Sequence, residues 1–121
     1  IWMRAQLGER PEVLPPEVLG QVQTPRIETP HEIGSSKWRR ERLQSASYAL
    51  GWRVFDYAGE TLVFHAGAVQ GYRAMVGLLP EHGIGVAVLW NSNSGVPGGL
   101  MPTVLDEALG LEGPDWLETD K

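Results

Sequence analysis

The stretch TLVFHAGAVQGYRAMVGLLPEHGIGVAVLW, residues 61–90, decides the fold of this chain. Three runs rich in aromatic and β-branched residues predict β-strands: residues 61–65, 72–79 and 84–90. Gly67 and Gly71 bracket the first connection, which we expect to be a loop, and residues 80–83 read as a turn. Connections this short join antiparallel neighbours. The run 84–90 is nearly all apolar, so we expect it to be covered on both faces.

The flanks of this stretch extend the pattern in both directions. Residues 48–57 predict a further strand of the same antiparallel sheet. Residues 100–109 predict a helix, because their apolar positions recur with helical spacing while Asp106 and Glu107 fall outside the apolar stripe. Gly110 is expected to end that helix.

The first part of the chain is less regular. Residues 1–7 read as the end of an amphipathic helix followed by Gly8, and residues 15–22 predict a short helix. Residues 24–46 are polar and interrupted by proline, so we expect a long connector. The basic run at 37–40 favours a solvated turn or strand entry over a patch for an anionic partner.

Together these elements predict an α+β fold in which an antiparallel sheet is packed by helices. We expect one partial domain over residues 1–121. Helical segments and the connector occupy 1–46, antiparallel strands 47–94, and the closing helix 100–110. The sequence begins without an initiator methionine, which suggests a piece cut from something longer.

Composition excludes several classes of function. A formal net charge of −5 gives no electrostatic case for nucleic acid. The absence of cysteine excludes disulfides, thiolate metal sites and a cysteine nucleophile. His31-Glu32 lacks the second histidine of a zinc-binding helix, so we predict no metal and no cofactor.

His65 is the first candidate for chemistry. It closes the predicted strand 61–65 and is followed by the small residues Ala66, Gly67 and Ala68. This arrangement places an imidazole beside backbone that another group can approach closely. A single histidine at a strand end is more often structural or exposed, so the pattern alone leaves both readings open.

A set of short motifs occurs here in one order with compact spacing: Tyr48-Ala49-Leu50-Gly51-Trp52, His65-Ala66-Gly67, Gly71-Tyr72, Leu79-Pro80-Glu81, and Gly85-Val86-Ala87-Val88-Leu89 with Asn91. From Tyr48 to Leu109 the chain resembles the C-terminal part of class C β-lactamases and the related esterases, peptidases and penicillin-binding proteins. The resemblance implies a serine hydrolase that works through an acyl-enzyme.

The resemblance also implies site residues. His65-Ala66-Gly67 stands where many members have Lys-Thr-Gly on the strand that edges the active site. His65 would be a catalytic residue. Ala66, Gly67 and Ala68 would bind substrate, and the backbone N–H of Ala68 would contribute to the oxyanion hole.

Two departures qualify this picture. The family's Ser-x-x-Lys and Tyr-x-Asn motifs are absent and would lie upstream of residue 1, so we expect the 121-residue chain alone to be inactive. Val96 and Gly99 stand where class C enzymes hold the β-lactam carboxylate, and neither side chain can bind it. An esterase or a peptidase of D-amino-acid peptides is therefore favoured over a true β-lactamase. The alternative is a non-catalytic binding or signalling module with the same fold.

The implied partners are a small ester, amide or peptide substrate and the N-terminal part of the same protein. Without that part, the chain is expected to self-associate through uncovered apolar surface and an unpaired strand edge. The resemblance favours a periplasmic or secreted location, which nothing else in the sequence specifies.

Overall fold

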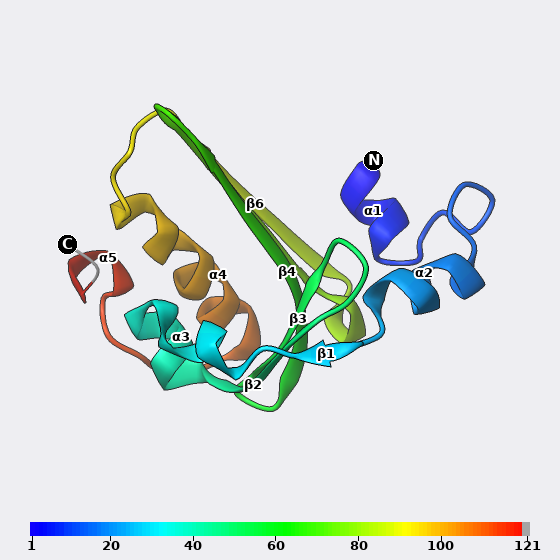
Figure 1. The fold of residues 1–121 in the computed structure, drawn as a ribbon, viewed down its shortest axis with the longest axis horizontal. Helices are drawn as coiled ribbons and strands as arrows, with labels where there is room; N and C mark the ends of the chain where they lie inside the picture. Colours follow the sequence, from blue (N-terminus) through cyan, green and yellow to red (C-terminus); the bar gives the residue numbers. More distant parts are fainter. Residues whose placement is uncertain (120–121) are drawn as a thin grey trace.

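The computed structural model describes residues 1–119 and is built on one antiparallel sheet (Figure 1). Each strand pairs with the next along the chain, so the order in the sheet is β1-β2-β3-β4-β5-β6. The strands are β1 (Ile27–Glu28), β2 (Leu43–Tyr48), β3 (Arg53–Tyr57), β4 (Glu60–Val69), β5 (Tyr72–Leu79) and β6 (Ile84–Trp90). The predicted α+β class, an antiparallel sheet with packed helices, is confirmed.

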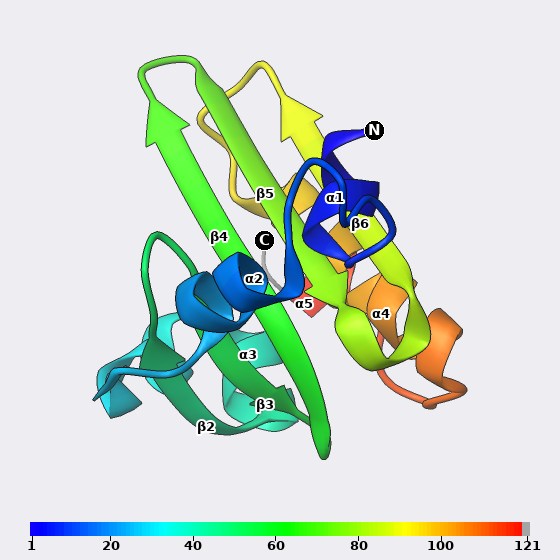
Figure 2. The ribbon, with the colours of Figure 1, turned by 90° about the vertical axis from the view of Figure 1, so that its right-hand side faces the viewer.

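Helices cover both faces of this sheet (Figures 1 and 2). The helices are α1 (Trp2–Gln6), α2 (Pro16–Gln23), α3 (Lys37–Arg42), α4 (Leu100–Leu109) and α5 (Trp116–Thr119), and the 3-10 turns are η1 (Pro30–Ser35), η2 (Pro80–His82) and η3 (Val96–Gly99). In Figure 1 the sheet is seen nearly edge-on, with α3, α4 and α5 on one side and α1 and α2 on the other. No helix among residues 1–119 combines the length and apolarity needed to cross a membrane.

The alternation of side chains along β4 divides the core into two clusters. Leu62 and Phe64 belong to the larger cluster, which α3, α4 and α5 complete. Val63 points the other way and belongs to a smaller cluster with Trp52, against which Met3 of α1 packs. Both layers therefore depend on the register of this one strand.

The predicted connector at 24–46 is wrong, because it holds β1, η1, α3 and the first half of β2. The basic run within it is helical, not a solvated turn or strand entry, and two of its residues are buried. Trp38 is 1% exposed and Arg39 8% exposed. Arg39 is buried because Glu32 pairs with it at 2.8 Å and aromatic rings, including that of Phe64, lie against its guanidinium.

Two strand boundaries also differ from the prediction. The run 48–57 is the end of β2 and all of β3, separated by a turn in which Gly51 has φ +80°. β4 does not end at His65 but continues to Val69, so no loop begins at Gly67. The reversal comes later, where Gly71 adopts φ +85°.

The burial of several residues also differs from the sequence prediction. β6 is not covered on both faces, since Leu89 is 74% exposed. It is also an edge of the sheet. Trp2 is 55% exposed and stacks on Trp52. The helix at 100–109 and its end at Gly110 (φ +69°) are confirmed, but Asp106 is buried although it falls outside the apolar stripe.

Candidate active site

The second half of β4 extends beyond its neighbour β3 (Figure 2). Pairing with β3 runs from Tyr57↔Glu60 to Arg53↔Phe64 and ends there. Pairing with β5 continues to the tip of the hairpin at Val69↔Tyr72. Among the residues that the structure describes, 65–69 are therefore paired on one side only.

The hairpin register decides which backbone groups face this open edge. A two-residue turn joins Val69 to Tyr72, so these residues form a hydrogen-bonded pair. Hydrogen-bonded and non-hydrogen-bonded pairs alternate along an antiparallel ladder. Ala68 and Ala66 consequently fall in non-hydrogen-bonded pairs with β5, and their N–H and C=O groups point away from β5 toward the open edge.

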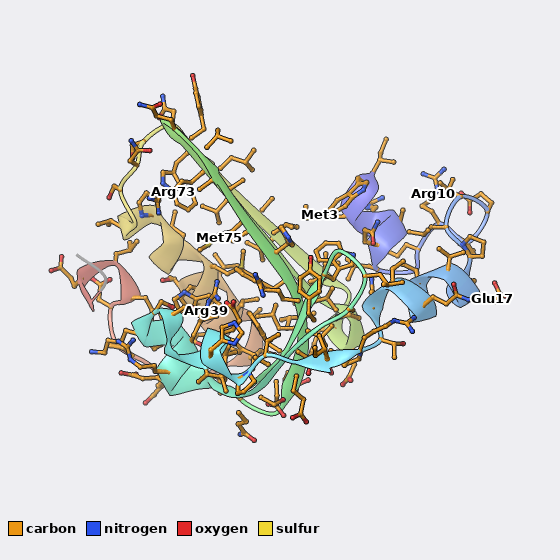
Figure 3. The ribbon with its side chains drawn as sticks, viewed as in Figure 1. Met3, Arg10, Glu17, Arg39, Arg73 and Met75 are labelled. Atoms are coloured by element: carbon orange, nitrogen blue, oxygen red, sulfur yellow. The ribbon has the colours of Figure 1, made fainter. Side chains whose placement is uncertain are left out.

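The side chain of His65 lies on the face of the sheet that carries α1, because it is two residues from Val63. It is partly exposed and lines a hollow of about 350 Å³ with Trp2, Met3 and Leu89 among others. Figure 3 shows Met3 on this side of the sheet. Its ring makes no hydrogen bond with any side chain or backbone group of residues 1–119, so both ring nitrogens remain available.

The small residues after His65 keep the open edge accessible. A Cβ added to Gly67 would meet nothing within 4 Å, so packing within this chain does not require glycine there. An apolar hollow of about 570 Å³ begins at Gly67 and Ala68 and continues past Tyr72 and Leu89. A ligand can therefore approach the backbone of residues 66–68 along an apolar surface.

The hairpin tip beside this hollow is fixed by hydrogen bonds from the loop after β6. The N–H of Gly71 donates to Oδ1 of Asn93 at 2.9 Å. Nε1–H of Trp90 donates to the backbone oxygen of Ser94, also at 2.9 Å. The first bond ties the tip of the β4–β5 hairpin to the loop after β6, and the second holds that loop against the end of β6.

Val96 and Gly99, which the sequence resemblance aligns with the carboxylate-binding positions of class C enzymes, lie in η3. Val96 begins this turn and Gly99 ends it. Gly99 is buried, and a Cβ there would stand 2.7 Å from the backbone oxygen of Trp116. No side chain fits at that position without movement of the backbone.

Sequence reasoning missed Arg73, which stands directly opposite Ala68 on β5. Its side chain shares the α4 face with Met75, and its Nε is buried without a hydrogen-bond partner among the described residues. The sequence pattern could have singled out Arg73, because it is a charged residue within the otherwise largely apolar run 72–79.

The other histidines lie in separate places. His31 is 3.4 Å from Glu32, and His82 is 3.0 Å from Glu60. Within residues 1–119 no group of three or more histidine or acidic side chains is placed to hold a metal ion.

Comparison with known proteins identifies the class to which this fold belongs. The solved structure of the octameric penicillin-binding protein homologue from Pyrococcus abyssi superimposes with a TM-score of 0.76 at 27% identity. The match covers 98% of this chain and 24% of that one. The family described as Beta-lactamase matches residues 11–109, so the chain belongs to the beta-lactamase family.

A curated relative belongs to the hydrolases by name. The unguisins hydrolase ungD' of Aspergillus campestris (strain IBT 28561) is 29% identical over 94 residues. These residues make up 77% of this chain and 16% of the relative. The chain thus spans less than a quarter of the length of either protein.

Proposed function

We propose that this chain forms one wall of the active site of a serine hydrolase related to class C β-lactamases. The observation that carries the proposal is the open edge of β4, where the backbone of Ala66 and Ala68 faces outward beside the unpaired ring of His65. Backbone N–H groups held on a rigid strand are suited to stabilise an oxyanion, because they need no reorganisation when its charge develops.

The nucleophile in this proposal comes from outside residues 1–121, where the Ser-x-x-Lys and Tyr-x-Asn motifs would lie. The serine Oγ attacks the carbonyl carbon, and its proton passes to a base. The carbonyl oxygen becomes an oxyanion that accepts a hydrogen bond from the N–H of Ala68. The leaving alcohol or amine departs with a proton, and water then hydrolyses the acyl-enzyme by the same steps.

The proposed substrate is an ester or a peptide of D-amino acids in preference to a β-lactam. His65 replaces the lysine of the Lys-Thr-Gly triplet, and Val96 and Gly99 offer no charge to a carboxylate. The apolar hollow beside Gly67 and Ala68 suits an acyl group or a small side chain.

The proposed partner is the rest of the same protein, seated on the α1 face and against β6. Exposed apolar side chains gather there: Trp2 (55%), Val69 (69%), Tyr72 (63%) and Leu89 (74%). An apolar surface of this kind beside an unpaired strand edge favours burial against another segment.

Replacement of Ala68 by proline tests the oxyanion assignment. Proline removes the N–H but leaves the β4–β5 pairing intact, because this N–H points to the open edge. In the full-length protein, kcat for p-nitrophenyl butyrate should fall by about 10²-fold to 10³-fold. Ala68→Gly keeps the N–H and should stay near wild type.

Mass spectrometry of the quenched reaction completes this test. An acyl adduct on a serine outside residues 1–121 supports the proposal. If the wild-type protein forms no adduct with esters or D-amino-acid peptides, the chain is better described as a non-catalytic module that retains the fold. If Ala68→Pro keeps wild-type kcat, the oxyanion donor lies elsewhere.

A further inference from the structure

A second cavity lies on the opposite face of the sheet from His65. Its volume is about 530 Å³, and it opens between β5, α3 with the end of η1, and η3 with the residue before it. Figure 3 shows Arg73, Met75 and Arg39 on this side of the sheet, toward α3 and α4. The cavity is within the size range of small-molecule sites in proteins.

Four cationic side chains line this cavity: Lys37, Arg39, Arg40 and Arg73. None of its described lining residues is acidic. Such a concentration of positive charge within one cavity is unfavourable unless negative charge compensates it.

Within the part of the chain that the structure describes, carboxylates pair with two of these four cations. Arg39 pairs with Glu32 at 2.8 Å, and Lys37 lies 3.7 Å from Glu41. Arg40 donates a hydrogen bond to a backbone oxygen, at Gly34. Arg73 has no hydrogen bond or ion pair with residues 1–119. Within residues 1–119, neither Arg73 nor the exposed Arg40 has a carboxylate partner.

The residues that line this cavity also carry polar atoms that have no hydrogen-bond partner among residues 1–119. Ser36 Oγ, Arg39 Nε and Arg73 Nε are each buried and lack a hydrogen bond. A buried donor without an acceptor destabilises the folded protein. All three atoms belong to side chains that line the cavity, and reorientation of these side chains would present them to an occupant that carries several acceptor oxygens.

We propose that this cavity binds a small dianion of the phosphate type, either inorganic phosphate or the phosphate group of a phosphomonoester. Its two charges match the two uncompensated guanidinium groups. Its terminal oxygens accept more hydrogen bonds than the two oxygens of a carboxylate, and arginine forks suit their geometry. The proposal does not depend on the acyl chemistry at Ala68, although Arg73 stands opposite Ala68 and also lines the apolar hollow beside it.

Calorimetric titration of the full-length protein with inorganic phosphate tests the proposal without any need for catalysis. Phosphate should bind saturably, and Arg73→Gln should weaken it by about tenfold or more. Arg26→Gln is the matched control, because Arg26 is exposed and lies outside the cavity lining. A parallel titration with phenyl phosphate separates the two sources: whichever binds more tightly identifies the free anion or the esterified group.

If Arg73→Gln does not fold, a second pair of variants tests phosphate binding instead. Gly95 lines the cavity with φ −85°, and a Cβ added there meets nothing within 4 Å. Gly95→Asp should abolish phosphate binding by placing a carboxylate at the cavity, whereas the neutral Gly95→Asn should retain it. The proposal is overturned if wild type shows no saturable phosphate binding, if Gly95→Asp binds like Gly95→Asn, or if succinate binds more tightly than phosphate.

Discussion

Asp106 is the residue of α4 whose replacement tests the packing behind the site most directly. Its carboxylate accepts hydrogen bonds from Tyr57 Oη at 2.6 Å, from Nε and Nη2 of Arg42 at 3.0 and 2.9 Å, and from Trp116 Nε1 at 2.9 Å. Asp106 is 6% exposed. One carboxylate thus joins β3, α3 and α5 to α4.

Asp106→Asn should lower the free energy of unfolding by about 3–5 kcal/mol at pH 7, the usual cost of breaking a buried ion pair on one side. The amide keeps the shape, but its NH2 group cannot accept from the donors that surround it. Glu107→Gln is the matched control, because Glu107 neighbours it on α4 and is exposed. It should change stability by no more than about 0.5 kcal/mol.

The pH dependence supplies an independent check. Burial acts to raise the pKa of Asp106, but the hydrogen bonds from Arg42, Tyr57 and Trp116 outweigh it and lower that pKa below 3.8. A depressed folded-state pKa means that the stabilisation is fully present above pH 3.8 and is lost as the pH falls through the folded value. The difference between wild type and Asp106→Asn should therefore shrink below pH 3.8. Urea denaturation followed by tryptophan fluorescence measures both effects, and a loss below 1 kcal/mol at pH 7 would refute the reasoning.

Three further predictions concern the fold, the site and the isolated chain. Gly99→Ala should destabilise by about 1–3 kcal/mol in thermal unfolding, because its Cβ meets the Trp116 carbonyl, whereas Gly95→Ala should be neutral. In the full-length protein, His65→Ala should lower kcat/KM for p-nitrophenyl butyrate by about 10²-fold to 10⁴-fold if His65 transfers protons, while His82→Ala should not; unchanged turnover would make His65 structural. The 121-residue chain alone should hydrolyse this ester no faster than buffer and should sediment as a dimer or larger. A stable monomer would contradict the proposed docking surface on the α1 face and β6.

Local chemistry made the hairpin region predictable. The predictions of strands at 72–79 and 84–90 and of a helix at 100–109 were correct, because each element combines an apolar pattern with a positive-φ glycine directly before or after it. The sequence alone also showed that three small residues follow His65. What the sequence did not reveal was that β4 runs on past His65, because Ala66, Gly67 and Ala68 carry almost no strand preference of their own. Pairing with β5 imposes the strand there.

Long-range contacts explain the other errors. Arg39 and Asp106 are polar residues that the sequence pattern assigns to solvent, yet both are buried and each forms an ion pair with a residue of another element. Asp106 pairs with Arg42, 64 residues earlier in the chain. Arg39 pairs with Glu32 under the aromatic rings of the core. No local periodicity encodes these pairings, so helix α3 was read as part of a connector.

His65 and Arg73 lie on opposite faces of the β4–β5 strand pair, and the energetic coupling between them can be measured. His65 lies on the α1 face of β4, whereas Arg73 lies on the α4 face of β5, and the two side chains share no hydrogen-bond partner among residues 1–119. Substitutions at independent sites change free energy additively to within about 0.3–0.5 kcal/mol. The effects of His65→Ala and Arg73→Gln on kcat/KM should therefore add in the double variant. A coupling above about 1 kcal/mol would show that the anion cavity is part of the substrate site, and Arg73 would then belong to the machinery that recognises the substrate.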